Sequence, residues 1–152
     1  MRRTVKSLLG PRAGNLHVLG PDHTVREAVS LMNRKNIGAI LVMNPDDELL
    51  GVFTERDVLR RVLEDRLDPD ATALEAVMTR EVFWIGPEGT VEDAMALVNE
   101  HNVRHLPVMD EAQVLGMISV RDLTAAVVEN RELELADLTS YVHGSYGGHV
   151  QR

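Results

Sequence analysis

One heptapeptide occurs twice in this chain, with the same order of residue types in both copies. The first copy is residues 51–57 (GVFTERD) and the second is residues 116–122 (GMISVRD). In each copy a glycine begins a short apolar run, a hydroxyl residue ends it, and an Arg-Asp pair follows. This order predicts a strand that leads directly into the first turn of a helix. The N-terminus of a helix that follows a strand is a place where an anion can be held.

The rest of the chain repeats around this heptapeptide in constant register. Identical residues recur 66 positions apart before it and 65 positions apart from Leu50 onward. The pairs at 66 positions are Pro21 and Pro87, Thr24 and Thr90, Val25 and Val91, Ala28 and Ala94, Leu31 and Leu97, Asn33 and Asn99, Asn36 and Asn102, Val42 and Val108, and Met43 and Met109. The pairs at 65 positions are Leu50 and Leu115, Gly51 and Gly116, Arg56 and Arg121, and Asp57 and Asp122. This register indicates a tandem duplication.

Each copy has the pattern of a β-α-β-β-α unit, which predicts an α/β (α+β) fold. In the first copy we expect a lead-in strand at 16–19, a helix from Thr24, strands at 40–43 and 49–54, and a closing helix that ends near Asp68. In the second copy we expect a lead-in strand at 82–85, a helix from Thr90, strands at 103–109 and 114–119, and a helix at 122–128. A copy of about fifty residues is too short to bury a good core alone. We therefore expect the two repeats to pack sheet to sheet with pseudo-two-fold symmetry, so that equivalent strand ends face one cleft.

These elements divide the chain into five segments. Residues 1–15 form an N-terminal helix and linker, 16–68 the first repeat, 69–79 a helical bridge with its helix at 71–78, 80–130 the second repeat, and 131–152 a C-terminal helix and tail. Gly10, Pro11 and Gly14 end the N-terminal helix, which is expected within residues 1–9.

Composition excludes several classes of function. The net charge is −8 and no basic stripe compensates for it, which argues against nucleic acid as a partner. There is no cysteine, and the six histidines lack ligand spacing with carboxylates, so we expect neither thiol chemistry nor a metal site. No run of about 20 apolar residues predicts a membrane span, and nothing resembles a signal peptide. We therefore expect a soluble, cytoplasmic protein.

The two repeated carboxylates, Asp57 and Asp122, have two interpretations. Thr54 with Asp57 and Ser119 with Asp122 are capping boxes in their own right, so they need do no more than begin helices. A carboxylate beside a helix N-terminus can also accept hydrogen bonds from two neighbouring hydroxyls, which is what a ribose presents. The duplication favours the ligand interpretation and leaves the capping interpretation open.

The order and spacing of three motifs resemble a tandem pair of CBS domains, the Bateman module, over roughly residues 16–130. These motifs are the T-V-x-x-A helix starts at Thr24 and Thr90, the strand segments IGAILVM and VRHLPVM, and the two heptapeptides. The whole chain is similar to stand-alone bacterial proteins of this type. The resemblance implies a module that binds an adenine nucleotide between its repeats, forms homodimers, and modulates a partner protein. The implied ligand is AMP, ADP or ATP, or else NAD(H) or S-adenosylmethionine, with no required cofactor.

The resemblance also implies roles for individual residues. In the family the aspartate at the helix start holds the ribose hydroxyls, which assigns ribose binding to Asp57 and Asp122. The implied ribose and phosphate contacts are Thr54, Ser119, Arg104, His105, Arg56 and Arg121. The implied adenine-slot residues are Gly38, Ala39, Val52, Val103, Pro107, Met117 and Trp84. Trp84 has packing as its alternative role, and Arg56 and Arg121 have ion pairs on their own helices.

Arg104 and His105 distinguish the two expected sites. The first copy has Gly38 and Ala39 at the equivalent positions, without a cation. We therefore expect the site at Asp122 to be better equipped for phosphate than the site at Asp57.

Three functions are compatible with this sequence. The first is a nucleotide-responsive regulatory protein, the second an oligomeric structural module with an empty cleft, and the third an enzyme that acts on the bound nucleotide. No nucleophile–base set, Walker loop or Gly-x-Ser-x-Gly motif occurs, so we do not expect catalysis. For the homodimer, the apolar residues of the C-terminal segment that could contribute are Leu133, Leu135, Leu138 and Tyr141.

Overall fold

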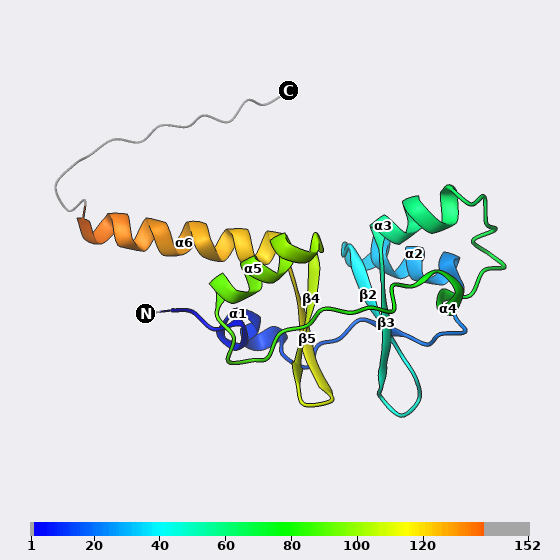
Figure 1. The fold of residues 1–152 in the computed structure, drawn as a ribbon, viewed down its shortest axis with the longest axis horizontal. Helices are drawn as coiled ribbons and strands as arrows, with labels where there is room; N and C mark the ends of the chain where they lie inside the picture. The colour runs from blue at the N-terminus through cyan, green and yellow to red at the C-terminus, as the bar shows by residue number, and fades with distance from the viewer. Residues whose placement is uncertain (1, 139–152) are drawn as a thin grey trace, which may run out of the picture.

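The computed structural model describes residues 2–138, and two β-α-β-β-α repeats follow one another in it (Figure 1). The elements of the first repeat are β1 (Val18–Leu19), α2 (Val25–Lys35), β2 (Ala39–Met43), β3 (Leu49–Thr54), and α3 (Glu55–Asp57) with its π-helical continuation Val58–Leu63. Strand β1 lies parallel to β2, and β2 lies antiparallel to β3. The fold class predicted from the duplication is therefore confirmed.

The second repeat has a smaller sheet. Its elements are α5 (Val91–His101), β4 (His105–Asp110), β5 (Gln113–Ser119) and α6 (Val120–Leu138). The lead-in strand predicted at 82–85 is reduced to one parallel bridge between Ile85 and Val108, so the sheet contains only β4 and β5. Helix α6 extends well beyond the predicted residues 122–128.

Local capping follows the sequence closely. Helices α2 and α5 each begin with a capping box, formed by Thr24 with Glu27 and by Thr90 with Asp93. Both helices end at an asparagine with positive φ, Asn36 at 54° and Asn102 at 50°. Asparagine tolerates this left-handed conformation, which stops a helix. The repeated asparagines therefore end equivalent helices for the same physical reason.

The two sheets share an apolar layer. Strand β2 is buried on both faces, because Ile40 and Val42 belong to the core of the first repeat while Leu41 and Met43 belong to a second core. This alternation has the period of two that a strand imposes. Val114 of β5 lies in the second core with Leu41 and Met43, so that core joins the two repeats.

Two short helices occupy equivalent places on the repeats. Helix α4 (Leu74–Val77), shorter than the predicted 71–78, packs against β3 of the first repeat. Helix α1 (Val5–Leu9) packs against β5 of the second repeat, although the first repeat follows it in the chain (Figure 1). Both approach a strand glycine closely: a Cβ on Gly51 would lie 2.7 Å from the Thr79 carbonyl oxygen, and one on Gly116 would lie 2.8 Å from Cδ2 of Leu9. The N-terminal helix therefore completes the second repeat.

Candidate functional site

A cleft of about 560 Å³ lies where the repeats meet, beside the junction of β3 and α3. The first repeat contributes residues 38, 52, 54–57 and 59–61, the second contributes residues 101–105, and the linker contributes residues 79 and 81–83. This volume is within the range of small-molecule sites, about 300–1,000 Å³. The cleft therefore has room for a ligand that touches both repeats.

Asp57 is the one buried charged residue among those that the structure describes, with 5% of its surface exposed. Its Oδ2 accepts hydrogen bonds from the backbone N–H of Thr54 at 3.0 Å and from the Thr54 hydroxyl at 3.2 Å. Its Oδ1 accepts a hydrogen bond from the Thr79 hydroxyl at 2.9 Å and lies 3.6 Å from Nε of Arg61. Asp57 therefore caps α3, and a ligand hydroxyl would have to share Oδ1 with Thr79.

Arg104 and His105 line the same cleft from the other repeat. The two hairpins are close here, because a Cβ on Gly38 would lie 3.3 Å from Cε1 of His105. Burial lowers the pKa of His105 below its ordinary value of 6.5, and it outweighs the carboxylates of Glu55 and Asp122, which act in the opposite direction. At neutral pH the cation facing Asp57 across the cleft is therefore Arg104, while His105 is uncharged.

This placement corrects the predicted asymmetry between the sites. The sequence comparison assigns Arg104 and His105 to the Asp122 site, but both line the cleft that contains Asp57. The sheets face each other, so the start of β4 lies across from the helix start of the other repeat. The site at Asp57 is therefore the one that combines a carboxylate with the Arg104 guanidinium.

Arg56 joins the two walls of the cleft. Its Nη1 donates a hydrogen bond to the backbone carbonyl oxygen of Asn102 at 2.6 Å. Asn102 ends α5, so the guanidinium lies at the negative end of that helix. Arg56 therefore connects the first repeat to the second, and part of its donor capacity is already used.

Three residues of the cleft were missed in the sequence. Phe83 and His101 stack with ring centroids 3.7 Å apart and an angle of 11° between the rings. Thr79 comes from the linker and carries no local signal of its contact with Asp57. Arg61 could have been predicted to contact Asp57, since i, i+4 positions are neighbours on a helix.

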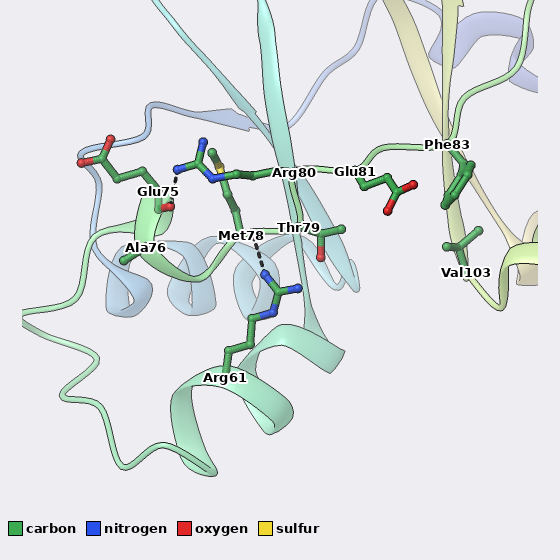
Figure 2. A pocket seen from close by; sticks show the side chains of 9 residues that line it. All are labelled: Arg61, Glu75, Ala76, Met78, Thr79, Arg80, Glu81, Phe83 and Val103. Atoms are coloured by element: carbon green, nitrogen blue, oxygen red, sulfur yellow. Dashed lines mark hydrogen bonds between the residues drawn. The ribbon is translucent and has the colours of Figure 1, made fainter.

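A second hollow of about 490 Å³ adjoins the cleft along the linker (Figure 2). The two hollows have five lining residues in common, which are Arg61, Thr79, Glu81, Phe83 and Val103. Figure 2 shows Arg61 extending from its helix toward Met78, whose carbonyl oxygen accepts a hydrogen bond from Nη1 at 2.6 Å. Residues 79–83 of the linker therefore form a wall common to both hollows.

Several predicted site residues lie elsewhere. Those that do not line the cleft are Ala39, Pro107, Met117, Trp84, Ser119, Arg121 and Asp122. Trp84 is 51% exposed, which contradicts both the stacking and the packing interpretation. Neighbouring side chains in an extended segment point to opposite sides, so Phe83 faces the cleft in its place.

Asp122 has the capping geometry of Asp57 in a more exposed setting. Its Oδ2 accepts hydrogen bonds from the Ser119 backbone N–H at 2.8 Å and from the Ser119 hydroxyl at 3.0 Å. Its Oδ1 lies 3.4 Å from Nη1 of Arg12, and 27% of its side chain is exposed. The two aspartates therefore begin their helices alike but have different partners at Oδ1.

The family model for the CBS domain matches the chain twice, at residues 5–64 and 68–129. This chain belongs to the CBS-domain family. The mitochondrial CBS domain-containing protein CBSX3 of Arabidopsis thaliana is 36% identical over 129 residues, which cover 82% of this CBS pair and 63% of that relative. The crystal structure of the CBS domain NE2398 is 39% identical, with a TM-score of 0.79, and covers 84% of this chain and 99% of that one.

A crystal structure of CBSX2 in complex with AMP has the same fold. Its TM-score is 0.69 at 24% sequence identity, over 85% of this chain and 98% of that one. Within residues 2–138 of this CBS pair, no cluster of three or more His, Asp or Glu side chains is arranged to hold a metal ion. Over the same residues, every helix is too short or too polar to cross a membrane.

Proposed function

We propose that this CBS pair is a regulatory module that binds an adenine nucleotide in the cleft beside Asp57 and modulates a partner protein in the cytoplasm. The observation that carries this proposal is that Asp57 and Arg104 line one cleft from opposite repeats. A carboxylate suits ribose hydroxyls, and a guanidinium suits a phosphate. CBSX2, which has the same fold, is known in complex with AMP. We propose no catalytic role for the chain.

Local charge supports an anionic ligand in this cleft. Arginines 56, 60, 61 and 104 line it, against the carboxylates of Glu55, Asp57 and Glu81. The whole chain has a net charge of −8, which disfavours anions at long range. The cleft therefore differs in sign from the protein around it, and phosphate contacts would be charge-assisted.

The cleft also offers an apolar surface for a base. Val52 and Val103 line it from the two repeats, and Phe83 lies beside them with His101 stacked on its ring. Stacking a base on an aromatic side chain contributes about 1–3 kcal/mol. We propose that the base lies against this surface, which places adenine near Phe83 and not near Trp84.

A thermal-shift panel tests the proposal with AMP, ATP, NAD, NADH and S-adenosylmethionine. A ligand that binds only the native state raises the unfolding temperature, by an amount that grows with its concentration. The strongest ligand is then compared with its 2′-deoxy and 3′-deoxy forms by calorimetry. Loss of one charge-assisted hydrogen bond to Asp57 should weaken affinity about tenfold, since one decade is about 1.4 kcal/mol.

A structural module with an empty cleft is the second candidate. It is favoured by one observation, that both carboxylate oxygens of Asp57 already have partners in the chain. In that case none of the five ligands shifts the unfolding temperature. Asp57→Ala would then lower stability by about 0.5–2 kcal/mol, as the loss of a helix cap does, and change nothing else.

We further propose a homodimer that buries exposed apolar side chains of α6. Val128 is 51% exposed and Leu133 is 64% exposed, which leaves apolar surface for a partner copy. Leu135 is 56% exposed on the same helix. The side chain of Leu138 and the whole of Tyr141 lie outside the described residues. Light scattering at micromolar concentrations should give twice the mass of the chain; a monomer would contradict this arrangement.

A further inference from the structure

The N-terminal segment reaches the second aspartate through Arg12. We infer that Arg12 determines which aspartate accepts a ribose, because it engages Oδ1 of Asp122 and confines nucleotide binding to the cleft at Asp57. Arg12 Nη1 lies 3.4 Å from that oxygen, in a linker that precedes the whole first repeat. The inference rests on the proposed function, since it concerns how the two potential ribose sites differ.

The linker that carries Arg12 is longer than its counterpart in the other repeat. Thr4 pairs with Thr90 and Ala73 pairs with Thr24, so Thr4 and Ala73 are equivalent and stand 69 positions apart. Leu19 and Ile85 pair with equivalent strand residues, Val42 and Val108, and stand only 66 positions apart. The difference, 69 − 66, leaves three extra residues after α1. This is the length of the 3-10 turn Gly10–Arg12.

The extra turn changes the partner of the carboxylate. At the first aspartate, Oδ1 accepts from the hydroxyl of Thr79. Counted back from Leu19, the counterpart of Thr79 is Ala13, which has no hydroxyl. Arg12 lies beside it, and the neighbouring Gly14 N–H donates to the Leu115 carbonyl oxygen at 2.7 Å, which holds the linker against β5. One carboxylate therefore has a neutral partner at Oδ1 and the other has a guanidinium.

This difference has a direct consequence for ligand binding. A hydroxyl donates one hydrogen bond and leaves the second lone pair of Oδ1 available, and the charge of the carboxylate is kept. A guanidinium compensates that charge, so a ribose hydroxyl at Asp122 would compete with an ion pair. The Arg12 side chain is 50% exposed, so it can be replaced without opening the core. Asp122 is therefore a ribose site closed by the chain's own cation.

Calorimetric titration of the full chain with AMP tests this inference. Wild type should bind one AMP per chain, and Asp57→Ala should bind none. The double variant Asp57→Ala with Arg12→Ala should regain one AMP per chain, at least tenfold tighter than Asp57→Ala alone. Adding Asp122→Ala should abolish this binding again. Arg12→Gln in place of Arg12→Ala should behave in the same way, and thermal melts show that each variant is folded.

Arg3 provides a matched control. It also belongs to the N-terminal segment and contacts the last helix, where Nη1 lies 2.7 Å from Oε2 of Glu129. Asp57→Ala with Arg3→Ala removes the same charge and loosens the same segment, and it should not bind AMP. Restored binding in this control would overturn the inference, because release of the segment alone would then open the site.

The remaining outcomes separate the inference from the proposed function. If wild type binds one AMP through Asp57 but the Arg12 variants never regain binding, the inference is wrong and the proposed function stands. If wild type binds two AMP and Arg12→Ala loses one, Arg12 contacts phosphate and the inference is also wrong. If wild type binds none but Arg12→Ala binds one through Asp122, the site at Asp57 is wrong and the inference survives. If no variant binds AMP, both are overturned.

Discussion

The hydroxyl of Thr79 donates a hydrogen bond to Oδ1 of Asp57 at 2.9 Å, across 22 positions of the chain. The backbone of Thr79 is fixed as well, because it exchanges hydrogen bonds with Val52 in both directions, at 2.9 and 3.0 Å. The Asp57 carboxylate is therefore oriented by a donor that is itself part of the sheet edge. The linker between the repeats positions the acceptor that we assign to ribose.

Thr79→Val tests this relationship. The substitution keeps the shape of the side chain and removes one donor from a buried carboxylate, so the free energy of unfolding should fall by about 1.5–3 kcal/mol. Urea unfolding measures the change. Thr124→Val is the control, because the Thr124 hydroxyl donates to the Val120 carbonyl oxygen on an exposed part of α6, and its loss should change stability by less than about 0.5 kcal/mol. Equal effects of the two substitutions would show that the bond to Asp57 is not special.

Gly51→Ala and Gly116→Ala should differ although the two glycines are equivalent. A Cβ on Gly51 meets the backbone oxygen of Thr79 at 2.7 Å, whereas one on Gly116 meets the terminal methyl of Leu9 at 2.8 Å. A side chain can turn away and a carbonyl in the sheet cannot, so we expect a loss of about 1–3 kcal/mol for Gly51→Ala and a smaller loss for Gly116→Ala. Thermal unfolding of the two variants gives the order, and the reverse order would contradict this account of the close approach.

Arg104→Ala should weaken AMP about fivefold to tenfold, because one charge-assisted contact to phosphate is lost from an exposed side chain. Adenosine, which has no phosphate, should bind nearly as before. The difference between the two ligands should shrink as salt is added, since screening weakens the pair. Calorimetry at low and high salt measures both affinities. An equal loss for AMP and adenosine would mean that Arg104 shapes the cleft and does not contact phosphate.

Protonation of His105 should lower stability as the pH falls below about 6.5, the value of an unperturbed histidine. Burial lowers the pKa of the folded imidazole, so the unfolded chain takes up the proton first and gains free energy relative to the native state. His105→Gln should therefore show a flatter dependence of the unfolding free energy on pH between 6.5 and the lower pKa of the folded state. Parallel curves for the variant and wild type over this range would contradict the assignment.

The acidic limb of the stability curve should be common to both proteins. Backbone hydrogen bonds from Thr24 and Thr90 lower the pKa values of Glu27 and Asp93, respectively. These carboxylates contribute stability at neutral pH that is lost only at more acidic pH, as they become protonated. The histidine effect can therefore be measured above the pH at which the caps are lost.

The sequence by itself determined the features that depend on residues close together in the chain. The duplication, the buried alternation of β2, the capping boxes of α2 and α5 and the asparagines that end them all follow from local periodicity and side-chain chemistry. The capping role of Asp57 belongs to this group as well, since Thr54 is only three residues away. These features were predictable because short-range hydrogen bonds and side-chain spacing are nearly independent of the rest of the fold.

Only the tertiary structure decided which groups share a site. The packing of one sheet on the other places Arg104 in the cleft with Asp57, and it places α1 on the repeat that comes last in the chain. Thr79 and Arg12 reach their aspartates from 22 and 110 positions away, respectively. No local pattern specifies such contacts, because they result from apolar burial between elements distant in sequence, and burial favours contact without specifying the partner.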